Sequence, residues 1–146
     1  MAVETHRFGV QTRGDNEVID VTGQVARTLE VGTIRDGIAT TFVIGSTVGL
    51  TTTEFEPGLA THDLAAAFEK LAPRDGEYQH EKTWHDDNGH AHVRASLLGP
   101  SLAVPVVGGR LTLGQWQQIV LIDFDTRPRR REIVVQVVGE PAGGRT

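Results

Sequence analysis

Four histidines lie within thirteen residues of this chain, at His80, His85, His90 and His92, out of six histidines in the whole sequence. Imidazole is the commonest protein metal ligand, and its unperturbed pKa lies near neutrality. His90 and His92 lead into the strand-like run Val-Arg-Ala-Ser-Leu-Leu, and residues i and i+2 of a strand share one face. Two imidazoles so placed could converge on a metal ion or an anionic substrate. The alternative interpretation is an exposed polar loop that is rich in histidine.

Carboxylates and a serine provide further candidates. Glu54 and Glu56 follow the apolar run 48–53, where functional carboxylates are common, although a solvent-exposed pair explains the pattern equally well. The turn Gly-Pro-Ser101 could present the hydroxyl and backbone amide of Ser101 to an anion. This turn lacks the Gly-x-Ser-x-Gly nucleophile elbow, so a serine hydrolase is disfavoured.

Trp116 and Gln117 precede an apolar run, Ile119–Phe124. An indole beside a carboxamide can bind a planar ring, by stacking and by directional hydrogen bonds. For Trp116 alone we favour the alternative, a core tryptophan that fills the sheet interior. Replacing such a buried indole by alanine would destabilise the fold by roughly 3–5 kcal/mol.

The composition is that of one ordinary globular domain, with 146 residues, 38% of them hydrophobic and 23% charged. We assign residues 1–138 to this domain and the glycine-rich residues 139–146 to a flexible C-terminal tail. The formal net charge of −5 gives no support to a nucleic-acid partner. The run Arg127–Arg131 is a local exception, either a solvated turn or a phosphate site.

Several classes of site are excluded. The chain has no cysteine, so a metal would rest on His, Asp and Glu. There is neither a P-loop nor a Gly-x-Gly-x-x-Gly motif for a nucleotide cofactor. No apolar stretch approaches the roughly twenty residues that span a bilayer, and no signal peptide is visible. We therefore expect a cytoplasmic protein without a membrane partner.

Hydrophobic periodicity predicts many strands and two main helices. One helix runs from Thr22 to about Ile34, and the second is capped by Thr61, has Asp63 in its first turn and stops at Pro73. The expected strands are 8–12, 17–20, 38–44, 48–53, 78–84, 91–98, 102–106, 114–124 and 132–138. We predict an α+β domain, a largely antiparallel sheet covered by two helices.

Taken together, these residues resemble the YjbQ family, over nearly all of the chain from about Ile38 to Val138. The most specific match is Gly-Arg-Leu-Thr-Leu-Gly-Gln-Trp-Gln at 109–117, where the family hallmark has threonine in place of Gln115. The other matching segments are 45–54, Asp63, 78–80, 89–93 and 98–101.

One departure from the family pattern concerns the histidines. Many members carry His-Thr-Thr-Ala-Gly where this chain has Gly-Ser-Thr-Val-Gly, so Gly45 replaces a histidine that would join His80 and His92. The chain resembles a subgroup with Gly-Ser-Thr and Glu-x-Glu-Pro-Gly, the latter at 54–58. The resemblance implies that His90 supplies the missing ligand.

The resemblance also implies a homotrimer with sites near subunit boundaries, and an activity. Family members are labelled secondary thiamine-phosphate synthases, which join a pyrimidine pyrophosphate to a thiazole phosphate. For this chain we expect a divalent metal, zinc by preference, on His80, His90 and His92, because catalytic zinc accepts three imidazoles. The expected catalytic residues are Glu54, Asp63, His80 and His92, and those expected to bind the phosphorylated substrate are Ser101, Trp116 and Gln117.

A second hypothesis is a trimeric metal- or metabolite-binding protein without turnover. A positioned general base would distinguish the enzyme from this alternative, and Glu54 is the best candidate for that base.

Overall fold

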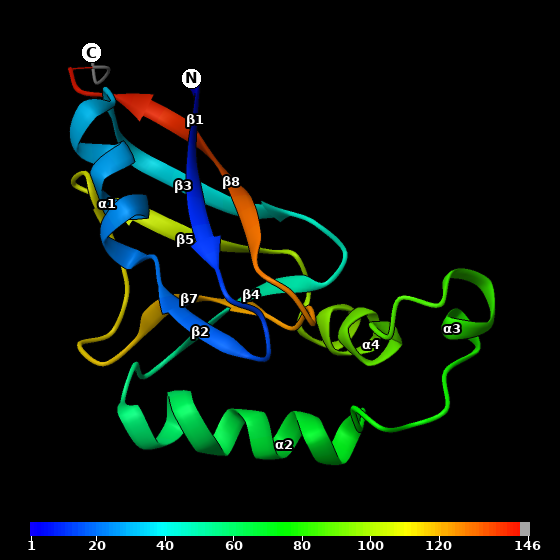
Figure 1. The fold of residues 1–146 in the computed structure, drawn as a ribbon. Coiled ribbons are helices and arrows are strands. Elements are labelled where there is room, and N and C mark those ends of the chain that lie inside the picture. The colour runs from blue at the N-terminus through cyan, green and yellow to red at the C-terminus, as the bar shows by residue number, and fades with distance from the viewer. Residues whose placement is uncertain (144–146) are drawn as a thin grey trace.

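The computed structural model describes residues 1–143, which form two antiparallel sheets (Figure 1). The larger sheet has the strand order β1-β8-β3-β5-β6, and the smaller sheet has the order β2-β7-β4. The strands are β1 (Ala2–Thr12), β2 (Glu17–Asp20), β3 (Ile34–Ile44), β4 (Val48–Thr53), β5 (Ser101–Val107), β6 (Arg110–Leu111), β7 (Gln118–Asp123) and β8 (Arg129–Pro141). The predicted α+β domain with a largely antiparallel sheet is confirmed.

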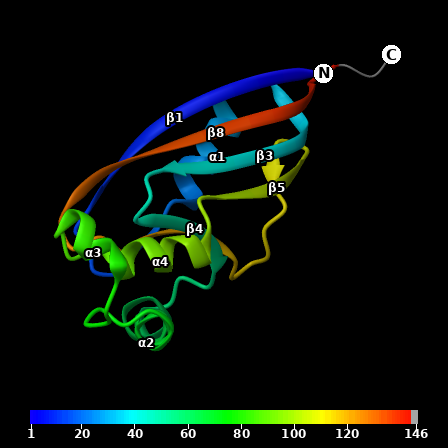
Figure 2. The same ribbon diagram turned by 90° about the vertical axis from the view of Figure 1, so that its right-hand side faces the viewer.

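Helices cover both sheets. They are α1 (Thr22–Val31), the π-helix η1 (Leu59–Asp63), α2 (Leu64–Leu71), α3 (Gln79–Trp84) and α4 (Gly89–Leu98). Helix α1 packs between the two sheets, while α2 and α4 lie on the other side of the smaller sheet, and α3 stands at one end (Figures 1 and 2). None of the helices in residues 1–143 has the length and apolar character that crossing a membrane requires.

The smaller sheet is the middle layer, because its central strand is buried on both faces. In β7, Ile119 and Leu121 join the main core beneath the larger sheet, whereas Val120 and Ile122 pack against α2 and α4. A strand buried on both faces needs a continuous apolar run, which is what the sequence Ile-Val-Leu-Ile provides.

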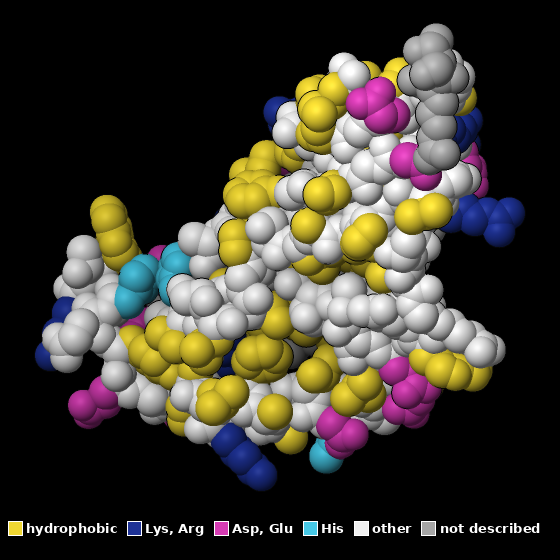
Figure 3. All heavy atoms as spheres, turned by 180° about the vertical axis from the view of Figure 1, so that it is seen from behind, with side chains coloured by type: hydrophobic (Ala, Val, Ile, Leu, Met, Phe, Trp, Pro, Cys, Tyr) yellow, Lys and Arg dark blue, Asp and Glu magenta, His cyan; other side chains and the backbone are white. Residues whose placement is uncertain are grey.

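The outer face of the larger sheet is unusually apolar. Strand β3 alternates buried and exposed side chains, but the exposed set includes Ile38, Phe42 and Ile44. Seen from behind the view of Figure 1, hydrophobic side chains gather over the sheet and over the helical part below it (Figure 3). A water-facing side of an antiparallel sheet is ordinarily polar, so this face has the composition of a surface that is covered.

The structure corrects several predicted boundaries. Strand β1 begins at Ala2 rather than Phe8, and α1 ends at Val31. Strand β8 runs to Pro141, so residues 139–141 belong to the domain and not to a tail. Residues 144–146 of that predicted tail lie outside the described residues. The segments 78–84 and 91–98, both predicted as strands, are instead largely the helices α3 and α4.

Candidate functional site

The histidine segment folds into two helices, which changes how its side chains meet. Residues two apart on a helix lie about 200° apart around its axis, so His90 and His92 cannot share a face as they would on a strand. His92 meets His80 of α3, with ring centroids 4.5 Å apart. His90 is instead 2% exposed, and its ring centroid lies 6.4 Å from that of Tyr78. The structure therefore pairs His80 with His92 and places His90 in the interior.

His80 carries an unsatisfied buried atom. Its Nδ1 is buried and has no hydrogen-bond partner among residues 1–143. Two carboxylates face it, with Asp86 Oδ1 at 3.3 Å and Glu81 Oε1 at 3.9 Å. A buried ring nitrogen without a partner is rare and calls for an explanation, such as an ion that is bound there.

The α3–α4 connection holds both carboxylates in place. The amide of Gly89 donates to Glu81 Oε1 at 2.5 Å, and the carboxamide of Asn88, in the orientation that satisfies both of its polar atoms, donates to Asp86 Oδ1 at 2.9 Å. Asp86 also stands between two non-glycine residues with positive φ, His85 and Asp87, each at 55°. Such left-handed residues are uncommon and concentrate at functional sites.

These three side chains fit a divalent cation. One ligand atom each from His80, Glu81 and Asp86 lies within 4.8 Å of the others. Two ligands of a tetrahedral ion with bonds of ~2.1 Å stand about 3.4 Å apart, close to the observed His80–Asp86 separation. One imidazole and two carboxylates form a donor set that zinc accepts. This set shares only His80 with the three imidazoles that were predicted.

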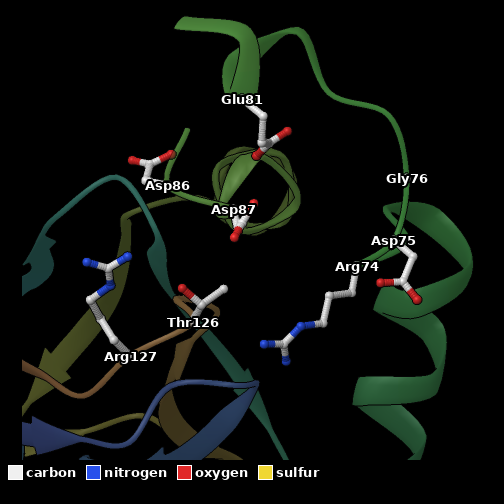
Figure 4. A pocket seen from close by; sticks show the side chains of 8 residues that line it. All are labelled: Arg74, Asp75, Gly76, Glu81, Asp86, Asp87, Thr126 and Arg127. Carbon is white, nitrogen blue, oxygen red and sulfur yellow. The ribbon is translucent and has the colours of Figure 1, made fainter. Parts of the chain in front are cut away.

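A polar cavity of about 490 Å³ adjoins this cluster. Figure 4 shows Arg74 and Arg127 approaching it from opposite sides, with Glu81, Asp86 and Asp87 between them. The other lining residues are Asp75, Gly76 and Thr126. Four carboxylates against two guanidinium groups give the lining a net charge of −2, so an anion would enter together with a cation.

The two arginines of the cavity differ in their pairing. Arg74 donates to Asp15 Oδ1 at 2.5 Å, whereas Arg127 forms no ion pair with any residue in 1–143. The sequence analysis singled out neither Glu81, Asp86 nor Arg74. The available signal was the turn Asp-Asp-Asn-Gly inside the histidine segment, which supplies oxygen ligands beside the imidazoles.

Within the rest of the arginine run, Arg131 is buried, whereas Arg129 and Arg130 are exposed. Arg131 donates through Nε and Nη2 to the two oxygens of Asp123, at 2.7 and 3.0 Å, and Arg129 donates to Asp125 at 3.0 Å. Thr47 links Arg131 to Asp125, since its hydroxyl accepts from Arg131 and donates to Asp125. We call this set, with Thr12 on Asp123, the Asp125 network. It rules out a wholly solvated turn and leaves Arg127 for the cavity.

Two buried groups have shifted pKa values. Burial raises the pKa of Asp125, but the hydrogen bonds from Thr47 and the Thr126 amide and the charge of Arg129 outweigh it, so the pKa falls below its ordinary value. Burial lowers the pKa of His90, and the charges of Arg94 and Arg74 lower it further. His90 is therefore a neutral imidazole near pH 7.

Two of the three predicted substrate residues lie around a different hollow. Ser101 and Gln117 line a cavity of about 320 Å³ together with Thr52. Gln117 donates to Thr52 Oγ1 at 3.0 Å and accepts from the Gly114 amide at 3.1 Å. Trp116 is 67% exposed, so the interpretation as a core tryptophan is wrong.

The two predicted catalytic carboxylates lie away from the histidine pair within one chain. Glu54 is exposed just after β4, and Asp63 is exposed in η1, where it pairs with His62 at 2.9 Å. Neither residue lines the polar cavity. Their catalytic roles stay predictions, and in one chain neither is positioned as a base for the histidine pair.

Comparison with known proteins identifies the family. The model for "UPF0047 protein YjbQ-like" matches residues 6–140. The chain belongs to the YjbQ-like UPF0047 family. A UPF0047 protein of Methanothermobacter thermautotrophicus is 38% identical, over 97% of this chain and 96% of its own. One from Archaeoglobus fulgidus is 40% identical, over 84% of this chain and 91% of its own.

Solved structures share the fold. A hypothetical protein from Aeropyrum pernix K1 superposes with a TM-score of 0.86 and 34% identity, over 94% of this chain and 99% of its own. A YbjQ-like protein of unknown function from Sulfolobus solfataricus P2 superposes with a TM-score of 0.85 and 30% identity, over 95% of this chain and 100% of its own. The fold is thus shared over nearly the whole chain.

Proposed function

We propose that this UPF0047 protein is a cation-dependent enzyme that acts on a phosphorylated heterocycle, in a reaction like that of thiamine-phosphate synthase. The observation that carries the proposal is His80 Nδ1, which has no hydrogen-bond partner among residues 1–143 and faces Glu81 and Asp86. The adjoining cavity is also lined by Arg127, which has no ion-pair partner within the same residues. The cluster offers a place for a cation, and the arginines offer donors to phosphate oxygens.

In the proposed reaction a bond forms between the thiazole nitrogen and the pyrimidine methylene carbon. The carbon–oxygen bond to pyrophosphate breaks, and its electron pair leaves on the pyrophosphate oxygen. Arg127 donates to that oxygen and Arg74 to the same group from the opposite wall (Figure 4). A divalent ion, when bound by His80, Glu81 and Asp86, supplies charge neutralisation. No proton is removed in this step, so it does not require Glu54 as a base.

Two further roles belong to the proposal. The heterocyclic ring of the substrate is proposed to contact Ser101, Trp116 and Gln117, at the hollow that Ser101 and Gln117 line. We also propose a homotrimer. The exposed apolar face of β3 is typical of an interface, and the same apolar face of a second copy can pack against it. The family resemblance favours three copies.

Metal analysis and a turnover assay on the same sample test the proposal. Protein purified without a His-tag and exposed to zinc should hold about one equivalent per chain, and it should release pyrophosphate from the two substrates. His80→Ala and Asp86→Asn should lose the metal. The matched control is His62→Ala, an exposed histidine that also pairs with an aspartate but lies on η1.

The outcomes separate the two candidate functions. Full metal content in Asp86→Asn would show that the ligand set is wrong. Metal binding at this cluster without pyrophosphate release would favour the alternative, a metal- or metabolite-binding protein without turnover.

A further inference from the structure

We infer that Asp125 is a positioning residue for the phosphate-binding arginine, an inference that rests on the proposed function. Asp125 is 1% exposed and does not line the cavity itself. It directly precedes Thr126 and Arg127, which do. Its carboxylate fixes the turn between β7 and β8 that carries these two residues to the cavity wall.

The carboxylate of Asp125 is bonded on both oxygens. Oδ1 accepts from the Thr126 amide at 2.7 Å, and Oδ2 accepts from Thr47 at 2.9 Å and from Arg129 Nε at 3.0 Å. The backbone of Asp125 is held as well, since its amide donates to Asp123 Oδ1 at 3.0 Å. The turn is thereby tied to the β3–β4 connection through Thr47 and to β8 through Arg129.

The β1–β2 turn closes on the same residue from the other side. The carbonyl of Asp125 accepts from the Asp15 amide at 2.8 Å. An ideal Cβ at Gly14 would lie 2.4 Å from that carbonyl oxygen, so a glycine is needed for this approach, and its φ is +87°. Contacts from three neighbouring segments therefore converge on the residue that begins the turn.

The charge of Asp125 also matters for Arg127. The carboxylate is matched by Arg129 at 3.0 Å and by Arg131 at 3.8 Å, so it is already balanced when Arg127 reaches the cavity. Arg127 therefore lies at the cavity without an ion-pair partner among residues 1–143, and its guanidinium is available to an anion.

An asparagine at residue 125 cannot satisfy the same partners. Its carboxamide has one acceptor oxygen and one donor nitrogen, whereas the Thr126 amide and Arg129 Nε both donate. One of these bonds must break, and the turn must loosen or shift. Asp125→Asn keeps the size of the side chain, so the effect isolates the lost acceptor.

Magnesium pyrophosphate, measured by titration calorimetry, is the binding probe. Arg127→Ala should weaken its binding about tenfold or more, and Asp125→Asn about three- to tenfold. The matched control is Asp36→Asn, another aspartate that accepts from a turn amide, that of Gly108, at a distance from the cavity. If Asp125→Asn fails to fold, Thr47→Val removes one bond to the same carboxylate.

Amide hydrogen exchange supplies a readout that needs no ligand. In Asp125→Asn the Thr126 and Arg127 amides should exchange about tenfold faster than in Asp36→Asn, while core amides match. Equal exchange in the two variants would overturn the inference. Wild-type affinity in Asp125→Asn with loss in Arg127→Ala would overturn it too, yet leave the proposed function standing. Absence of pyrophosphate binding in the wild type would count against the proposed function and, with it, against the phosphate-binding role of Arg127.

Discussion

The guanidinium of Arg131 occupies the space where a side chain at Gly45 would begin. An ideal Cβ at Gly45 would lie 2.7 Å from Arg131 Nη1 and 2.9 Å from Val48 Cγ1, and the φ of Gly45 is +144°. Arg131 cannot simply withdraw, because it is bonded to Asp123 and Thr47. A histidine at residue 45, which the family resemblance implies for many members, is therefore incompatible with this placement of Arg131.

Replacing Gly45 by alanine should destabilise the protein by about 1–3 kcal/mol, because the new methyl group meets the guanidinium in a backbone conformation that L-residues rarely adopt. Urea unfolding measures the change. Gly23→Ala is the control, since Gly23 lies in α1 with open space around it and alanine favours a helix there by about 0.5–1 kcal/mol. An unchanged free energy of unfolding in Gly45→Ala would show that the Asp125 network tolerates displacement of Arg131.

Trp116→Ala should leave the free energy of unfolding within about 0.5 kcal/mol of the wild type, because the indole is exposed. Gln117→Ala should lower it by about 0.5–1.5 kcal/mol for each lost hydrogen bond. If this corner binds the ring, both variants should also weaken binding of a thiazole phosphate, measured by calorimetry. Trp84→Ala, which removes an equally exposed indole near the histidines, should not. Unchanged affinity in both variants would make the corner structural.

Phe42→Glu should break the proposed trimer, because it places a charge at the centre of the apolar outer face of β3. Light scattering should then give the monomer mass of 15.8 kDa in place of three times that value. Val31→Glu is the control, since Val31 is an exposed apolar residue on α1, away from that face. A wild-type protein that is already monomeric at micromolar concentration would contradict the assembly.

Acid should destabilise the protein partly through Asp125. Its pKa is lowered in the folded state, so the folded state binds fewer protons than the unfolded state and the stability is present above the unfolded pKa of about 3.9. That stability is lost as the pH falls below this value and through the folded pKa. Asp125→Asn should flatten this acid limb in urea titrations. The substitution should not abolish the acid limb, because the pKa values of Glu4 and Glu69 are also lowered.

The strands were predictable where their side chains follow simple rules. The apolar run of β7 and the alternation of β3 were found, because burial on two faces and on one face leaves those patterns in a sequence. Their starts were each four residues off, since β7 begins at Gln118 rather than at residue 114 and β3 at Ile34 rather than at residue 38. The outer face of β3 shows the limit of this reasoning, since its exposed positions are apolar as well.

Helix α4 could not be recognised from periodicity. Its buried side includes His90 and Arg94, while Val93 and Leu97 are exposed, which reverses the usual distribution. Arg94 is tolerated inside because it donates to Ala72, Asn16 and Glu69. These partners are 22 to 78 residues away in the sequence, so a local sequence pattern cannot predict that Arg94 is buried. The candidate site could not be predicted for the same reason. The approach of His80 to Asp86 depends on helix α3, whereas the sequence pattern predicts a strand there.

Helix α3 has no buried side chain, although it carries His80 and Glu81. A helix of six residues is not stable by itself, so its order rests on the polar contacts of the α3–α4 connection. A ligand that binds only the ordered segment shifts its local folding equilibrium, by about 2.7 kcal/mol at one hundred times the dissociation constant. We therefore expect a protease to cut first within segment 76–88, and we expect a ligand bound at the cluster to slow that cleavage.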